Sequence, residues 1–165
     1  MRSYTQEELD KLIKCRKIIT KPPKEKMRLE KGSYRNDMEL FSEDKQFRFT
    51  SFMRRNEDYP ENFSIGLDYH PKEERASICL IRCNGPHGDF NSAESNNPHF
   101  QSHVHKAKAE NIEAGLRPEK HAEIIDAYAS YEEALQYFLK YVNAINTSQY
   151  PELLQLKMDL QNKGS

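Results

Sequence analysis

The segment FSIGLDYHPKEERASICLIRCN, residues 63–84, decides the fold that we expect for this chain. Its first half alternates strictly between apolar residues and small or polar ones, the apolar positions being Phe63, Ile65, Leu67 and Tyr69. A period of two is typical of a strand that buries one face and exposes the other. A polar turn at 70–74 ends this strand, and a second apolar run follows at 76–83. The segment therefore predicts two adjacent antiparallel strands.

The residues upstream of this segment continue the same period. Met38 and Leu40 lie two apart, as do Phe47 and Phe49, and turn-forming residues at 42–45 separate the two pairs. Such turns recur at intervals of about ten residues, which is typical of short strands joined by hairpins. We therefore expect an antiparallel meander of about five strands between 26 and 84.

Helices are predicted at both ends of the chain. Two pairs of residues have the spacing of a capping box: Thr5 with Glu8, and Ser130 with Glu133. Such a box marks the first turn of a helix. Apolar residues at helical intervals follow both pairs, which predicts helices over about 6–19 and 131–145. Beyond the central loop we expect a strand at 99–105, a short helix at 106–114 that Gly115 ends, and a last helix from Pro151.

These elements indicate an α+β fold, a single domain over residues 1–165. We expect one antiparallel β-meander of about five strands, with an N-terminal helix and C-terminal helices packed on one face. The apolar side of the sheet and the apolar stripe of the helix at 131–145 are expected to form the core, with Phe63, Ile65, Leu67, Ile78 and Leu80 against Leu135, Phe138, Leu139 and Val142.

Composition narrows the classes of function. The net charge of −1 at pH 7 excludes a protein whose whole surface is built for duplex DNA. No run of 18 apolar residues is present and the first residues lack an apolar signal core, so no membrane contact is expected. Three cysteines without framework spacing suit reduced thiols, and we expect a cytoplasmic protein.

The histidines are the strongest candidates for chemistry, because all six lie between positions 70 and 121. His103 and His105 would project from the same face of a strand, roughly 7 Å apart. One hypothesis is a metal site of His87, His103 and His105, with His99, Asp89 or Glu94 as a further ligand and zinc as the ion; no other cofactor is expected. A second is an acid–base pair of His103 and His105, with Lys106 or Arg82 stabilising negative charge on a phosphodiester. A third is that these histidines only make surface hydrogen bonds.

A basic strand is the other candidate site. It carries Arg48, Phe52, Arg54 and Arg55, to which Arg82 of the last strand would add. Basic side chains around a flat ring on a sheet are suited to single-stranded RNA, since the charges meet phosphates and the ring stacks under a base. The alternative is a solvated sheet face whose arginines pair with carboxylates on neighbouring strands.

Four motifs between Phe63 and Asn146 resemble a group of small bacterial proteins carried on phages and other mobile elements: FSIGLDY, LIRCNGPHG, HFQSHVHKA and AGLRPEKHAEIIDAYASYEEALQYFL. The resemblance implies a setting of bacterial conflict: a toxin–antitoxin module, phage defence or inhibition of defence. The order of elements is also similar to RelE-like ribonuclease toxins. An RNA-contacting protein is the expectation that follows. The alternatives are a non-enzymatic module that binds or inhibits a protein and forms a homodimer, and a metal-binding domain built on the histidines. Whether the protein is an enzyme stays open at this point.

Overall fold

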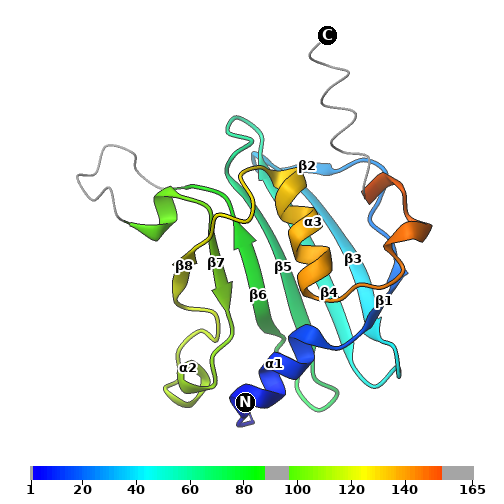
Figure 1. The fold of residues 1–165 in the computed structure, drawn as a ribbon, viewed down its shortest axis with the longest axis vertical. Coiled ribbons are helices and arrows are strands. Elements are labelled where there is room, and N and C mark those ends of the chain that lie inside the picture. Colours follow the sequence, from blue (N-terminus) through cyan, green and yellow to red (C-terminus); the bar gives the residue numbers. More distant parts are fainter. Residues whose placement is uncertain (1, 88–96, 154–165) are drawn as a thin grey trace.

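Within residues 2–87 and 97–153, which the computed structural model describes, the chain folds into an antiparallel sheet of eight strands and three α-helices (Figure 1). The α+β class is confirmed, with more strands than the five expected. The strands are β1 (Lys17–Lys21), β2 (Arg28–Glu30), β3 (Ser33–Ser42), β4 (Arg48–Asn56), β5 (Phe63–His70), β6 (Ile78–Asn84), β7 (His103–Lys106) and β8 (Ala122–Ile124).

The strands follow one another as a meander over most of the sheet. From β3 to β8 the order in the sheet is the order in the chain, and β1 and β2 both pair with β3. Every pairing is antiparallel. The predicted pair within 63–84 forms as β5 and β6, with Ile65 opposite Cys83. β7 and β8 then extend the sheet beyond β6.

The helices at 6–14 and 131–141 begin where their capping boxes predict, whereas the helix at 109–113 has no side-chain cap. They are α1 (Gln6–Lys14), α2 (Ala109–Glu113) and α3 (Tyr131–Tyr141), with 3-10 turns η1 (Pro98–Phe100) and η2 (Thr147–Gln149). The Thr5 hydroxyl accepts the backbone N–H of Glu8 at 3.0 Å. The Ser130 hydroxyl accepts that of Glu133 at 3.2 Å, which confirms the second box.

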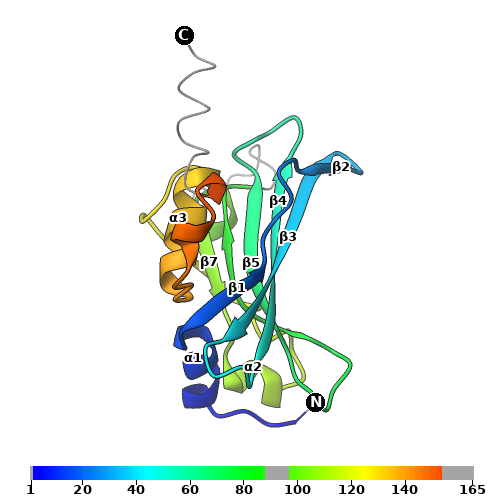
Figure 2. The same ribbon diagram turned by 90° about the vertical axis from the view of Figure 1, so that its right-hand side faces the viewer.

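The core lies between the sheet and the two helices α1 and α3, which share one side of it (Figure 2). α3 packs on β5 and β6, and α1 packs on β6. The predicted packing is confirmed, since all nine predicted residues are buried in one cluster and the Phe138 ring is fully inaccessible. The apolar half of each alternating strand therefore faces the helices, and the other half forms an outer face that neither α1 nor α3 covers.

The prediction of a helix over 6–19 was wrong in its second half. α1 ends at Lys14, and Lys17–Lys21 forms β1 instead. The spacing of apolar residues fitted a helix, but β-branched residues favour a strand, and here Ile19 pairs with Leu40 on the edge of β3. The Asn146 side chain holds the edge of β1 that faces away from β3, because its amide oxygen accepts the N–H of Ile19 and its amide nitrogen donates to the Ile19 carbonyl.

Lys17 links the ends of the two core helices. Its side chain is fully buried, and its ammonium donates to the carbonyls of Ile13 at 2.7 Å, Cys15 at 2.9 Å and Val142 at 2.8 Å. Carbonyls at the C-terminal end of a helix lack partners within the helix and carry partial negative charge, which a cation there satisfies. A residue predicted as part of a helix is therefore a buried link between α1 and α3.

Smaller differences concern element ends. α3 stops at Tyr141 rather than at 145, and the strand expected at 99–105 is confined to His103–Lys106. The helix expected at 106–114 is α2, followed as predicted by Gly115 with a φ of 71°. Of the last predicted helix, residues 151–153 are described, with Leu153 buried in the core, and the residues from 154 on lie outside the described part of the chain.

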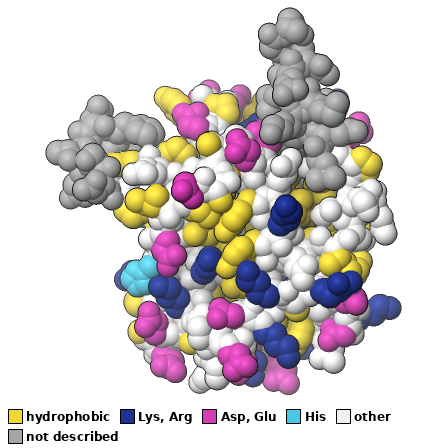
Figure 3. Space-filling view, in the orientation of Figure 1, with side chains coloured by type: hydrophobic (Ala, Val, Ile, Leu, Met, Phe, Trp, Pro, Cys, Tyr) yellow, Lys and Arg dark blue, Asp and Glu magenta, His cyan; other side chains and the backbone are white. Residues whose placement is uncertain are grey.

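The face that carries α1 and α3 shows no patch of one charge, because acidic and basic side chains are interspersed over it (Figure 3). None of the helices in the described part of the chain has the length and apolar character needed to cross a membrane.

Candidate metal centre

The outer face of the sheet carries the polar half of each central strand. A row of residues paired across β4 to β7 shows this, as Arg54 is opposite Ser64, Ser64 is opposite Asn84, and Asn84 is opposite His103. The next row places Arg82 opposite His105. Side chains of paired residues point to the same face. Arginines and histidines therefore share one side of the sheet.

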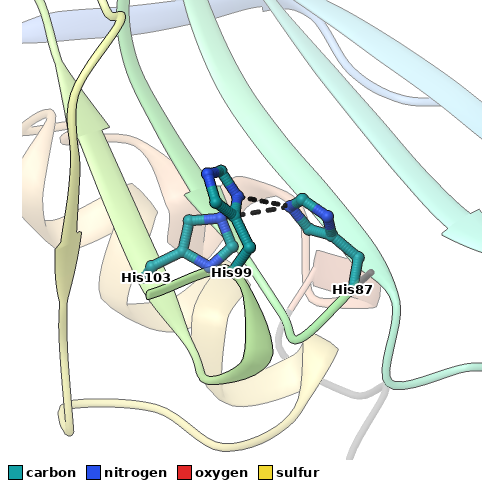
Figure 4. Close-up of side chains that lie close together, drawn as sticks. All are labelled: His87, His99 and His103. Carbon is teal, nitrogen blue, oxygen red and sulfur yellow. Dashed lines mark hydrogen bonds between the residues drawn. The ribbon is translucent and has the colours of Figure 1, made fainter. Parts of the chain in front are cut away.

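Three histidines converge at the end of this row (Figure 4). His87 follows β6, His99 lies in η1 and His103 is on β7. Their ligand nitrogens all lie within 4.8 Å of one another. The Nε2 atom of His87 is 3.2 Å from Nε2 of His103 and 3.2 Å from Nδ1 of His99. Two nitrogens bound to one tetrahedral zinc ion are about 3.3 Å apart, as follows from Zn–N bonds of 2.0–2.1 Å.

Backbone contacts bring the two loop histidines to the strand. The N–H of His87 donates to the carbonyl of His99 at 2.7 Å, which joins the start of the loop to η1. Gly85 makes the turn out of β6 close to β5, because a Cβ at this position would meet the Glu61 carbonyl oxygen and the Phe63 ring. A glycine is therefore required for the chain to place His87 here.

The hydrogen bonds of His103 leave a lone pair at the centre of the cluster. Its Nδ1 lies 2.8 Å from the carbonyl of Gln101, which can only accept, so Nδ1 carries the proton and Nε2 does not. The amide of Asn84 lies 3.3 Å from that Nε2, and the Ser64 hydroxyl donates to the same amide at 2.9 Å. The bond from Nδ1 to the Gln101 carbonyl fixes the orientation and the tautomer of the ring, as around metal-bound histidines. The Asn84 amide contacts the nitrogen that would bind the metal, and a bound ion would take the place of this contact.

Burial favours the neutral form of two of these rings. The pKa of His103 is lowered to about 4, by burial first and with a contribution from the neighbouring histidines. The pKa of His87 is also lowered, by burial first and then by His99, Arg82 and Arg54. Neutral imidazole is the form that binds metal. A metal ion at the centre of the three rings would accept one lone pair from each.

His105 lies beside the three converging nitrogens without joining them. Its ring centroid is 5.2 Å from that of His103 and 5.9 Å from that of His99. Its Nδ1 donates to the carbonyl of Glu119 at 2.9 Å, while its buried Nε2 has no hydrogen-bond partner among the described residues. The converging set therefore contains His99, and not His105 as predicted. Asp89 and Glu94, named as further ligands, lie outside the described residues.

Lys106 does not lie with the histidines, because it follows His105 on the strand and points to the helix side of the sheet. Its ammonium sits 4.7 Å from the centroid of the Tyr141 ring in α3. Arg82 remains on the outer face, 3.9 Å from the buried carboxylate of Glu119. Of the two cations proposed to stabilise a phosphodiester beside His103 and His105, only Arg82 is therefore on their side of the sheet.

The residues of the predicted basic strand lie on two sides of the sheet, because side chains alternate along β4. Arg48, Phe52 and Arg54 are on the outer face, and the Phe52 ring lies over Gly66, where a Cβ would collide with it. Arg55 is on the helix side, 3.8 Å from the Glu132 carboxylate.

Sequence reasoning did not find Arg35. It lies opposite Arg54 on the outer face. The alternation of β3 could have located it, since Met38 and Leu40 face the core and place the odd-numbered residues outside.

Comparison with known proteins shows that the chain matches a family whose activity is unknown. A model described as "Family of unknown function (DUF6978)" matches residues 4–144, a span that contains all six histidines. No curated protein and no solved structure matches the chain.

Proposed function

We propose that this chain, which belongs to the family of unknown function DUF6978, binds a divalent transition metal ion, zinc in the first place, through His87, His99 and His103. The observation that carries the proposal is the convergence of three imidazole nitrogens within 4.8 Å of one another. Imidazole is a preferred ligand of zinc, copper, iron and nickel.

Among the described residues three imidazoles converge, and a set of three protein ligands favours a reactive centre. A structural zinc site has four protein ligands, whereas a catalytic one has three and leaves a position for water or substrate. His87 and His99 are only half-buried, so solvent reaches the cluster from the loop side, while His103 is fully buried. An ion held in this way would lower the pKa of a bound water and supply hydroxide at neutral pH.

Metal titration tests the proposal. Chelator-treated protein should bind about one equivalent of zinc in calorimetry, and cobalt in its place should give the absorption bands of a four-coordinate site. His87→Ala, His99→Ala and His103→Ala should each weaken binding by at least tenfold. His121→Ala is the matched control, because His121 is exposed, and it should bind zinc as the wild type does. Wild-type protein that binds none of these ions would refute the proposal.

A second candidate function is contact with RNA on the same face. Arg48, Phe52, Arg54 and Arg82 share the outer side of the sheet, and the Phe52 ring lies over Gly66, where a Cβ would collide with it. A ring on an open sheet with arginines around it suits stacking of a base and contact with phosphates. The resemblance to proteins of mobile elements, with their toxin–antitoxin and defence systems, favours RNA as the polyanion.

Fluorescence anisotropy with a single-stranded RNA oligomer tests this candidate. Phe52→Ala and Arg54→Ala should weaken binding, and the affinity should fall as salt is raised. Arg55→Ala is the control, because Arg55 lies on the opposite side beside Glu132. Equal losses in all three variants, or no binding by the wild type, would contradict an RNA-binding outer face and favour a protein partner instead.

A further inference from the structure

A basic depression lies on the outer face beside the three histidines. Its volume is about 290 Å³, and four of its nine lining residues are arginines. Arg35, Arg54 and Arg82 come from three different strands, Arg28 stands at the rim, and Asp37 is the only carboxylate in the lining. We name Arg35, Arg54 and Arg82 the arginine cluster. The pairing of the strands brings these three arginines together. Arg35 on β3 is opposite Arg54 on β4. In the next row of the sheet, Phe52 is opposite Gly66, and Gly66 is opposite Arg82 on β6.

The positive charge of the cluster is poorly neutralised. Among the described residues, Arg82 has one distant carboxylate, Glu119 at 3.9 Å, and neither Arg35 nor Arg54 has a carboxylate within 4 Å. Glu119 is moreover shared with Arg117 at 2.8 Å.

Some of the donors in the cluster are also unused. The Nε atoms of Arg35 and Arg82 are buried and have no hydrogen-bond partner in the described part of the chain. Burial lowers the pKa of Arg54, and the charges of Arg35 and Arg82 lower it further. Buried donors without acceptors and cations without counter-ions both cost free energy, and an anion would relieve both costs.

The cluster and the histidines are parts of one surface. Arg54 and His103 stand in the same row, joined through Ser64 and Asn84. Three strand spacings separate the backbones of Arg54 and His103, which is about 14 Å. The long side chains of Arg54 and Arg82 extend over part of this distance. A ligand held by the guanidinium groups would therefore lie next to an ion bound by the three histidines.

From these contacts we propose that the arginine cluster binds a phosphate group, and that the substrate of the metal centre is a phosphate ester. Planar guanidinium groups match the oxygens of phosphate with paired hydrogen bonds, and several of them around one pocket are a common way to bind it. In the hydrolysis, the oxygen of water bonds to phosphorus, the ester P–O bond breaks, and the leaving alcohol takes up the proton that water loses. The reaction rests on the proposed metal centre, whereas phosphate binding by the cluster does not.

Calorimetric titration of the full chain, freed of metal by chelator, with inorganic phosphate at low salt tests the cluster. Phosphate should bind, and Arg35→Gln and Arg54→Gln should each weaken it at least tenfold. Arg16→Gln is the matched control, because Arg16 is exposed, pairs with Glu43 and lies outside the depression, and the phosphate affinity of this variant should match the wild type. Arg54 is exposed, so its variant keeps the fold even if Arg35→Gln does not. Wild-type protein that binds no millimolar phosphate, or binding that Arg54→Gln leaves unchanged, would overturn the phosphate site.

Zinc-loaded protein separates this inference from the metal centre itself. Phosphate should bind more tightly when zinc is present, and p-nitrophenyl phosphate and bis-p-nitrophenyl phosphate distinguish a monoester from a diester substrate. Hydrolysis of one of them that Arg54→Gln reduces tenfold supports the inference. Zinc binding without any effect of zinc on phosphate affinity, and without hydrolysis, would overturn it while the metal site stands. Phosphate binding in a protein that takes up no metal would instead refute the metal centre and leave the arginine cluster as an anion site.

Discussion

Replacing Lys17 by methionine should destabilise the fold by about 2–5 kcal/mol, as expected when the charged partner of a buried polar network is removed. The ammonium makes three hydrogen bonds to carbonyls at the ends of α1 and α3. Bonds from a charged donor contribute about 1.5–3 kcal/mol each. Burial opposes them, since it lowers the pKa of Lys17 from 10.5 to about 8. Keeping the group charged therefore costs about 3 kcal/mol. Methionine fills most of the space and leaves the carbonyls of Ile13 and Val142 unpaired.

Urea denaturation followed by far-UV circular dichroism measures this effect for the wild type, Lys17→Met and Lys21→Met. Lys21 is the matched control, since it lies at the exposed end of the same strand, and its replacement should change the free energy of unfolding by less than about 0.5 kcal/mol. A Lys17→Met variant as stable as the wild type would refute the reasoning, because it would mean that the hydrogen bonds of the ammonium only offset the cost of burying it.

Three further outcomes follow from the packing and the charges. Phe138→Ala should lower the free energy of unfolding by about 3–5 kcal/mol, because the ring is fully buried between α3 and the sheet, and a loss under 1 kcal/mol in urea denaturation would contradict that position. In metal-free protein the pKa values of His103 and His105 are lowered by burial from 6.5 to about 4. The unfolded chain then binds more protons between these values, so stability should fall as pH drops from 6.5 to 4, by up to about 3 kcal/mol per histidine, and a flat profile of unfolding free energy against pH would exclude neutral buried rings. Gly85→Ala should weaken zinc binding, because the new Cβ would strike the carbonyl of Glu61 and move the turn that carries His87, and a variant with unchanged zinc affinity would show that the turn does not position the site.

The local sequence pattern was sufficient to predict the centre of the fold. The alternation in 63–84 predicted β5, β6 and their inward residues, and the capping box with the apolar stripe at 131–145 predicted the helix that covers them, because burial of one face leaves a direct trace in the sequence. It was not sufficient for β1. Ile18 and Ile19 fit a helical stripe as well as a strand, and the choice is made by an edge of β3 about twenty residues away, which local pattern does not contain.

The site was predictable only where it lies on strands. Alternation alone places His103 and His105 on one face and assigns Lys106 to the other, and it separates Arg55 from Arg54 in the same way. His99 is different. It enters the site because the backbone of His87 bonds to it across the loop, and no periodicity predicts how a loop closes.

X-ray absorption spectroscopy at the zinc edge of the zinc-loaded protein tests the central claim most directly. The proposed site predicts three histidine nitrogens at about 2.0–2.1 Å with one further light ligand, and no sulfur at about 2.3 Å, because the converging set contains His87, His99 and His103 and none of the three cysteines, all of which are described. The His99→Ala variant should lose one imidazole from the spectrum or fail to hold zinc. A spectrum of oxygen ligands without imidazole scattering, or one that His99→Ala leaves unchanged, would contradict the three-histidine centre.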